Sequence, residues 1–283
     1  MSEDEAASIA KAGQEGRSNL LLRIAASLVL APFAILVAYA GGWLWAALVT
    51  AATIGLYVEW LTVISARKPR LVVLGVLILL GVGWIEAGHT TAAALVAVVV
   101  TGILAIAVFA PDRRIWAVAG LLYALAASIA SIAVRLDLVW GFAALMLVLL
   151  VVWATDIGGY FAGRLIGGPK LWPQVSPKKT WAGAAGGFVA SLAVATGFVM
   201  LGFGKTIPTL ALGAVLSVAS QLGDLFESAV KRRFGVKDSS HIIPGHGGLM
   251  DRLDGFVAAV VLAALFGFLR GGADGIGRGL MVW

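Results

Sequence analysis

Residues 228–254 combine acidic, basic and glycine residues more densely than any other part of the 283-residue chain. The charged residues of this segment are Lys231, Arg232, Arg233, Lys237, Asp238, Asp251, Arg252 and Asp254. A glycine-rich run at residues 244–248 lies among them and contains His246. Clustered cations bind phosphate groups, and carboxylates bind hard metal ions. The segment therefore predicts a site for a phosphorylated ligand and a divalent cation.

The acids near this segment have a spacing that brings them together. Asp224, Ser228 and Lys231 follow i, i+4 and i+7, which places them on one face of a helix. Asp251 and Asp254 lie about one helical turn apart at the start of the next apolar stretch. We expect carboxylates from both helices to converge. Oxygen ligands without His or Cys partners are typical of Mg²⁺, which is commonly held by one or two carboxylates plus substrate phosphates.

The cations of the same segment can neutralise the rest of a phosphate ligand. We expect Lys231, Arg232, Lys237 and Arg252 to contact it, and the glycine-rich run can bring backbone N–H groups close to a nucleotide. His246 lies between two glycines, where a substrate contact is a better interpretation than a metal ligand. The alternative is a cytoplasmic loop in which the charges only neutralise one another.

Asp156 is a single acid in an otherwise apolar stretch. A charge there costs about 2.5–3.5 kcal/mol on insertion scales, so it usually faces a partner or a wet cavity. Nearby glycines let a neighbouring backbone approach closely. Two interpretations stay open, namely a site residue and a structural ion pair with Arg164.

Lys178 and Lys179 directly precede the apolar stretch that begins at Trp181. Two lysines at a helix start oppose the helix dipole unless an anion is near. They either bind phosphate or anchor the helix at the membrane surface. Ser176 or Thr180 can cap this helix.

The composition predicts a polytopic all-α membrane protein. Only 13% of residues are charged, 60% are hydrophobic and the mean hydropathy is +0.98. The absence of cysteine excludes disulfides and thiolate metal sites. A spanning helix needs about 20 predominantly apolar residues. Nine segments qualify: roughly 22–40, 43–64, 71–87, 92–110, 115–134, 138–163, 181–203, 207–230 and 252–270.

The loop charges predict the orientation of these spans. With nine spans and a cytoplasmic N-terminus, most of the 21 lysines and arginines fall in cytoplasmic segments, as the positive-inside rule requires. We expect residues 1–22 to be a cytoplasmic tail and residues 23–150 to be a scaffold of about five spans. Residues 151–270 are then the catalytic region, and residues 271–283 form a C-terminal tail.

The polar residues resemble a known signature. The pattern extends from Ser228 through Lys231-Arg232, Lys237-Asp238, His246-Gly247-Gly248 and Asp251-Arg252 to Asp254, and it is similar to that of phosphatidate cytidylyltransferases (CDP-diacylglycerol synthases). The run SPKKTWAG and the run from Asp156 to Gly167 also resemble segments of that family, so the motifs cover roughly residues 155–255. Gly159 departs from the alanine expected beside Tyr160.

The resemblance implies transfer of a cytidylyl group from CTP to phosphatidate, with Mg²⁺ and release of pyrophosphate. It also implies a homodimer in a bacterial inner membrane, with the active site facing the cytoplasm. No nucleic-acid partner is expected. Whether a second, monovalent cation joins the Mg²⁺ is left open. Carried over by position, the metal ligands are Asp224 and Asp251, to which we add Asp156. The residues assigned to catalysis are Lys231, Arg232, Asp251 and Arg252. Those assigned to substrate binding are Ser176, Lys178, Lys179, Ser228, Lys237, Asp238, His246, Gly247, Gly248 and Asp254.

Two other functions stay open at this point. A CTP-dependent polyprenol-type lipid kinase would share a cytoplasmic nucleotide site but would transfer the γ-phosphate. An ion-coupled transporter could line its path with Asp156 and Asp224. The product released from CTP separates the first from a cytidylyltransferase, and flux without CTP would favour the second.

Overall fold

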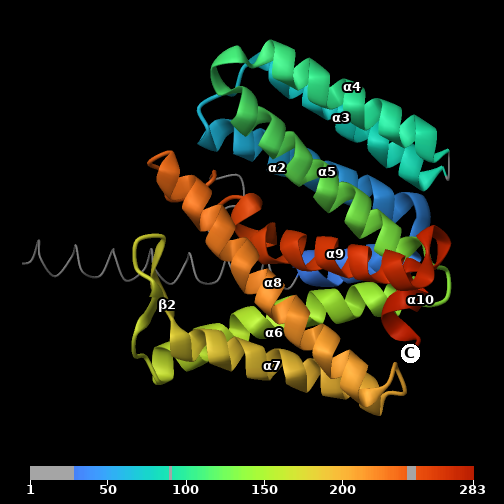
Figure 1. The fold of residues 1–283 in the computed structure, drawn as a ribbon, viewed down its shortest axis with the longest axis vertical. Coiled ribbons are helices and arrows are strands. Elements are labelled where there is room, and N and C mark those ends of the chain that lie inside the picture. The colour runs from blue at the N-terminus through green and yellow to red at the C-terminus, as the bar shows by residue number, and fades with distance from the viewer. Residues whose placement is uncertain (1–28, 89–90, 241–246) are drawn as a thin grey trace, which may run out of the picture.

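The computed structural model describes residues 29–88, 91–240 and 247–283, and these are almost entirely helical (Figure 1). Within them, eight helices are long and apolar enough to cross a membrane, and a shorter apolar helix covers Val29–Ala40. The long helices are α2 Gly42–Val63, α3 Pro69–Ala87, α4 Ala92–Phe109, α5 Arg114–Leu136, α6 Gly141–Leu165, α7 Trp181–Met200, α8 Thr206–Arg233 and α9 Met250–Gly271. The prediction of a polytopic all-α membrane protein is confirmed.

The predicted spans agree with the observed helices to within three residues at each end, as at 207–230 against Thr206–Arg233. The first predicted span, 22–40, has only its second part among the described residues. Local sequence signals determine where several of the helices begin. Pro69 begins α3, and the Thr91 and Thr180 hydroxyls accept hydrogen bonds from Ala94 N and Gly183 N at the starts of α4 and α7. Thr180, rather than Ser176, is therefore the cap before α7.

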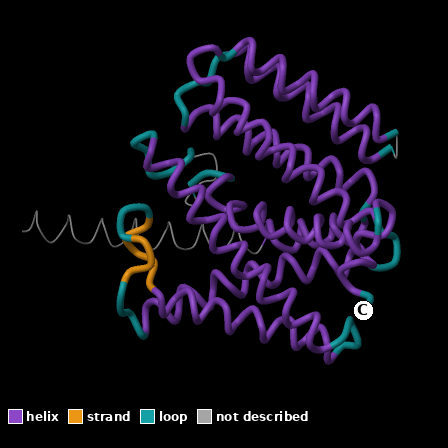
Figure 2. Tube along the Cα trace, in the orientation of Figure 1, coloured by secondary structure: helices purple, strands orange, loops and turns teal. Residues whose placement is uncertain are grey.

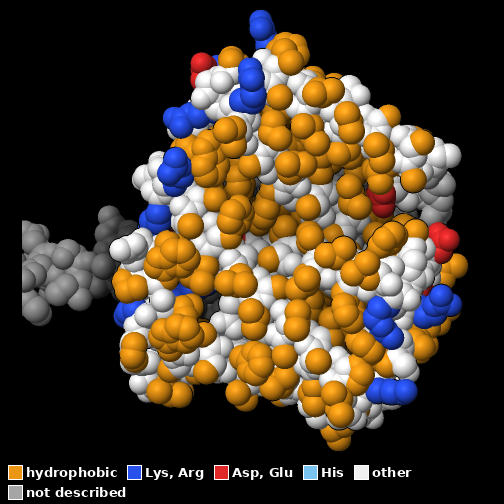
Figure 3. Space-filling model, viewed as in Figure 1, with side chains coloured by type: hydrophobic (Ala, Val, Ile, Leu, Met, Phe, Trp, Pro, Cys, Tyr) orange, Lys and Arg blue, Asp and Glu red, His pale blue; other side chains and the backbone are white. Residues whose placement is uncertain are grey.

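The helices pack around two apolar cores. One involves α2, α3 and α5 and includes Trp60, Leu79 and Leu121; the other involves α5, α6 and α9 and includes Leu145 and Val260. Helices α2, α5 and α9 contribute to both cores and join the two parts of the bundle (Figure 1). The outer face is mostly hydrophobic, with Lys and Arg side chains at its margins (Figure 3), as expected for a surface covered by lipid.

A β-hairpin before α7 is absent from the sequence prediction. Strand β1 Lys170–Trp172 pairs antiparallel with β2 Ser176–Thr180, with Lys170 opposite Thr180 and Trp172 opposite Ser176 (Figure 2). These strands are short and mostly exposed, so they lack the alternation of apolar and polar residues that identifies a half-buried strand. The hairpin carries Lys178 and Lys179 at the end of the bundle.

Residues 271–283, expected to be a tail, fold back onto the bundle. They form a 3-10 turn, η2 Ala273–Gly275, and helix α10 Ile276–Met281, which packs on α9 and α6. The Asp137 carboxylate accepts a hydrogen bond from Arg278 N at 2.7 Å, and Ile276, Leu280 and Met281 are buried. The segment is too short to span a membrane, so its apolar residues are covered by the protein instead.

Candidate active site

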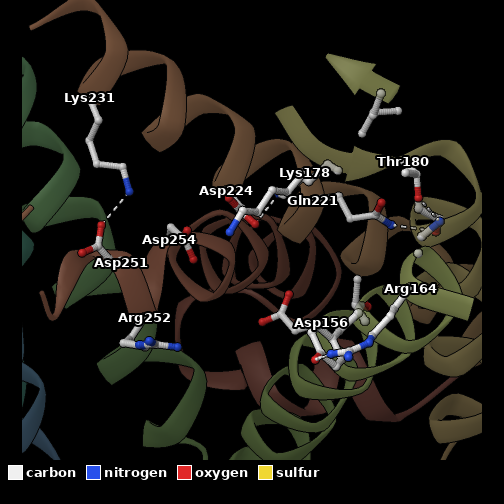
Figure 4. A pocket seen from close by; sticks show the side chains of 18 residues that line it. Asp156, Arg164, Lys178, Thr180, Gln221, Asp224, Lys231, Asp251, Arg252 and Asp254 are labelled. Atoms are coloured by element: carbon white, nitrogen blue, oxygen red, sulfur yellow. Dashed lines mark hydrogen bonds and ion pairs between the residues drawn. The ribbon is translucent and has the colours of Figure 1, made fainter. Parts of the chain in front are cut away.

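A cavity of about 760 Å³ opens where α6, the hairpin, α7, α8 and α9 meet. Its wall contains acids, cations, hydroxyls and glycines from all five elements (Figure 4). The charged residues that line it are Asp156, Arg164, Lys178, Lys179, Asp224, Lys231, Asp251, Arg252 and Asp254. The structure therefore brings together residues almost 100 positions apart, from each of the three polar clusters in the sequence.

Three of the acids form a group inside this cavity. Asp156 from α6, Asp224 from α8 and Asp254 from α9 point towards its middle in Figure 4, whereas Asp251 is turned towards Lys231. Arg164, the alternative partner considered for Asp156, donates its hydrogen bond to the Tyr160 hydroxyl at 2.8 Å. Three carboxyl groups at one place favour a cationic ligand there, because a cation stabilises their charged forms.

Lys179 is the cation next to Asp224, the acid of this group on α8. Its ammonium forms an ion pair with the Asp224 carboxylate, and both side chains are 29% exposed. Ser228, one turn along α8, lies with its hydroxyl 3.4 Å from Asp224 Oδ1. The hairpin is thereby connected to α8 across the cavity.

Lys231 forms two ion pairs, one within α8 and one from α8 to α9. Its Nζ lies 2.8 Å from Glu227 Oε2 and 2.6 Å from Asp251 Oδ1, and its side chain is only 10% exposed. Asp251 Oδ2 also accepts hydrogen bonds from Ser239 N at 3.1 Å and from Gly248 N at 3.0 Å. Glu227, which the sequence analysis did not assign to the site, therefore shares the charge of Lys231 with Asp251.

Other assigned residues lie around the cavity rather than in its wall. Arg232 donates to Val175 O and Val236 O and so supports the hairpin, while Lys237 and Asp238 are exposed in the turn after α8. Ser176 pairs with Trp172 in the hairpin. Gly247 has a φ of +82°, which favours glycine, and its neighbour Gly248 contacts Asp251. His246 lies outside the described residues.

One acid that the sequence analysis placed in the scaffold contacts this region. Glu59 of α2 accepts hydrogen bonds from Ser239, Ser240, Leu249 and Met250, next to Asp251. The signal was present in the sequence, because Glu59 is an acid inside an apolar span and such acids usually have a function.

Comparison with known proteins identifies the family of the chain. The profile of the Cytidylyltransferase family matches residues 21–269. A phosphatidate cytidylyltransferase of Brucella suis biovar 1 (strain 1330) is 38% identical over 270 residues, which cover 88% of this chain and 94% of the relative. One of Bacillus subtilis (strain 168) is 51% identical over 110 residues, 38% of this chain and 40% of the relative. The chain therefore belongs to the Cytidylyltransferase family.

Proposed function

We propose that this protein transfers the cytidylyl group of CTP to phosphatidate and releases pyrophosphate, forming CDP-diacylglycerol for phospholipid synthesis. The observation that carries the proposal is a cavity of mixed charge inside an integral membrane protein, with lysines and carboxylates from four elements on its wall. A lipid substrate with a phosphate head group needs a site within the membrane protein and charged side chains that bind the phosphate. The names of the full-length Brucella relatives point to the same reaction.

The acids of the cavity fit Mg²⁺ if the substrate supplies the remaining ligands. No group of three or more acids or histidines among the described residues is arranged to hold a metal ion alone. Mg²⁺ commonly uses one or two carboxylates together with substrate phosphates, so this does not argue against it. We assign the ion to Asp224 and Asp251, with Asp156 beside them; Asp251, which is turned towards Lys231 in the structure, would exchange that cation for the ion when CTP binds. Asp224 and Asp251 each form an ion pair with a lysine in the structure. When bound, Mg²⁺ would neutralise phosphate oxygens of CTP.

The cationic residues then bind the phosphates of both substrates. Lys178 and Lys179 lie on the hairpin side of the cavity and Arg252 lies on the α9 side. We assign Lys178 and Lys179 to the phosphate of phosphatidate or CTP. Lys231 and Arg252, which line the cavity, are assigned to the charge that develops on the pyrophosphate as it leaves, whereas Arg232, predicted for the same role, lies outside the wall and supports the hairpin.

The reaction needs positioning more than covalent help from the protein. An oxygen of the phosphatidate phosphate attacks the α-phosphorus of CTP, and the bond from that phosphorus to the bridging β-oxygen breaks. The attacking phosphate is already ionised at neutral pH, so no strong general base is required. Most of the rate enhancement in phosphoryl-type transfer comes from alignment and charge stabilisation.

The positive charges of the connections between helices indicate how the protein is oriented in the membrane. The cation-rich connections α2–α3, α4–α5, α6–α7 and α8–α9 lie at the same end of the bundle (Figure 1). By the positive-inside rule this end faces the cytoplasm, and so does the cavity. The relatives are bacterial, which favours the inner membrane. A homodimer and a second, monovalent cation stay predictions from the family.

The position of the radiolabel in the product tests the reaction. Purified protein in detergent is given phosphatidate, Mg²⁺ and CTP labelled at either the α- or the γ-phosphorus. We expect the α-label to enter the lipid and the γ-label to appear as pyrophosphate. A γ-labelled lipid would identify a kinase, and no labelled lipid in either reaction would contradict the proposal.

A further inference from the structure

Glu59 is a buried carboxylate that the reaction described above does not use. It lies on α2, is 1% exposed, and each of its oxygens accepts one hydroxyl and one backbone hydrogen bond. Oε1 accepts from Ser240 Oγ at 2.6 Å and Leu249 N at 2.9 Å. Oε2 accepts from Ser239 Oγ at 2.8 Å and Met250 N at 2.7 Å. Four donors from the connection between α8 and α9 thus converge on one side chain.

This arrangement caps a helix from a distance. The first N–H groups of a helix have no partners within it, and a negative charge near them is favourable. The start of α9 has no side-chain cap of its own, and Met250 N and Leu249 N instead donate to Glu59. A carboxylate on α2 therefore fixes where α9 begins.

The packing around Glu59 leaves no space for a side chain at two nearby glycines. A Cβ added to Gly248 would lie 2.6 Å from Glu59 Oε2, and one added to Gly55 would lie 2.8 Å from Leu249 Cδ2. Gly55 and Glu59 are one turn apart on α2, so the same face of this helix holds the connection by shape and by hydrogen bonds.

The residues that Glu59 holds are also the ones that hold Asp251. Ser239 donates its hydroxyl to Glu59 and its N–H to Asp251, and Gly248 packs on Glu59 while its N–H also donates to Asp251. Asp251 in turn binds Lys231. Glu59 and the cavity are thus connected through groups that each contact both carboxylates.

A buried charge is an expensive way to join two helices, because apolar side chains of similar volume are often equally stabilising. We propose that Glu59 is a positioning residue for the transfer reaction, which orients Asp251 and Arg252 towards the cavity by fixing residues 239–240 and 248–250. This inference rests on the assignment of the cavity as the reaction site.

Kinetics of Glu59→Gln test the proposal. The amide keeps the shape but places an NH₂ group opposite one backbone N–H, so that hydrogen bond is lost. We expect kcat/KM for CTP to fall by about tenfold or more, with KM for CTP raised, because the ligands of the site are misaligned. Loss of folded protein alone would lower the apparent kcat and leave KM unchanged. The matched control is Glu86→Gln, at the opposite end of the neighbouring helix α3, which should keep the wild-type KM.

Smaller changes keep the test valid if Glu59→Gln does not fold. Ser239→Ala and Ser240→Ala each remove one hydroxyl donor to Glu59, and each should raise KM for CTP by about threefold or more. In a double-mutant cycle, Ser239→Ala should add little to Glu59→Gln, since both substitutions act on Asp251 through the same group of hydrogen bonds around position 59. Hydrogen exchange should increase at residues 247–252 and stay unchanged in α7.

Three outcomes would overturn the proposal. One is a wild-type KM in Glu59→Gln, and another is additive effects of Ser239→Ala and Glu59→Gln. The third is an increase in hydrogen exchange throughout the protein, which would mean that Glu59 supports the fold in general. A wild-type protein without CTP-dependent transfer would instead contradict the proposed function, so the two failures are distinguishable.

Discussion

The two acids assigned to the metal differ in how firmly they are held. Asp224 has a partly exposed ion pair with Lys179 and a long contact with Ser228. Asp251 has Lys231 and the backbone donors of Ser239 and Gly248. Asp224 can therefore exchange its cation at little cost, whereas Asp251 is part of the structure of the α8–α9 connection.

This difference predicts separate effects of Asp224→Asn and Asp251→Asn. Both variants should reduce CTP-dependent transfer by about a hundredfold or more if both acids bind the metal. Only Asp251→Asn should also lower the apparent unfolding temperature, because it alone weakens an ion pair with Lys231 and hydrogen bonds from two backbone N–H groups. The control is Asp112→Asn, whose exposed pair with Lys68 lies outside the cavity. Near-normal transfer in both site variants would refute the metal assignment.

Substitution of Lys231 should destabilise the protein, and a second substitution at Glu227 should restore much of the lost stability. Lys231→Met leaves Glu227 and Asp251 close together without a cation, and breaking such a buried pair costs about 3–5 kcal/mol. The double variant with Glu227→Gln should regain much of the unfolding temperature in detergent. It should stay inactive, since the cation is still missing. Recovery of activity would show that Lys231 only balances Glu227.

At the level of elements, the α6–α7 contact decides where the hairpin lies relative to Asp156. A Cβ added to Gly186 would meet Ala162 and lie 3.0 Å from Gly158 O, and Gly159 and Gly183 are similarly close. Glycine at position 159 suits this close approach. Because β2 leads directly into α7, any separation of the two helices also moves Lys178 and Lys179.

We therefore expect Gly186→Ala to reduce transfer by about tenfold through displacement of the hairpin, and to destabilise the protein by about 1–3 kcal/mol. Gly197→Ala in the same helix is the matched control, because nothing lies within 4 Å of a Cβ there. It should be active and up to about 1 kcal/mol more stable, as alanine favours helix formation. Equal activity of both variants, measured by lipid product, would argue against this coupling.

The elements differ in how far the sequence could predict them. Hydropathy identified the spans because a membrane leaves helices as the only structure that satisfies the backbone of an open chain. The same criterion assigned α2 to the scaffold, although Glu59 connects it to the site. The lysine–carboxylate pairs depend on which helices are neighbours in space. Spacing along the chain could place Asp224 near Lys231, but not near Lys179.

At the scale of the whole molecule, the topology places the cavity on one side of the membrane. The natural absence of cysteine makes this testable without background labelling. Asp112 in the 3-10 turn Pro111–Arg113 and Asp274 in η2 are both exposed and lie at opposite ends of the bundle in the predicted topology.

We expect a membrane-impermeant maleimide to label Asp274→Cys in intact spheroplasts and Asp112→Cys only after permeabilisation. Transfer activity should be retained by both variants, which confirms that the labelled protein is folded. The opposite labelling pattern would place the cavity outside the cytoplasm, where CTP is not supplied, and would refute the predicted orientation.

The pairing of Lys179 with Asp224 and of Lys231 with Asp251 also bears on selectivity among small solutes. Lysines that are already paired with carboxylates offer little attraction to chloride or to other singly charged anions of the cell. A polyphosphate accompanied by its own divalent ion brings both signs of charge at once and can exchange partners with each pair. Ordinary salt should therefore compete only weakly with the nucleotide, even though the chain as a whole is strongly basic.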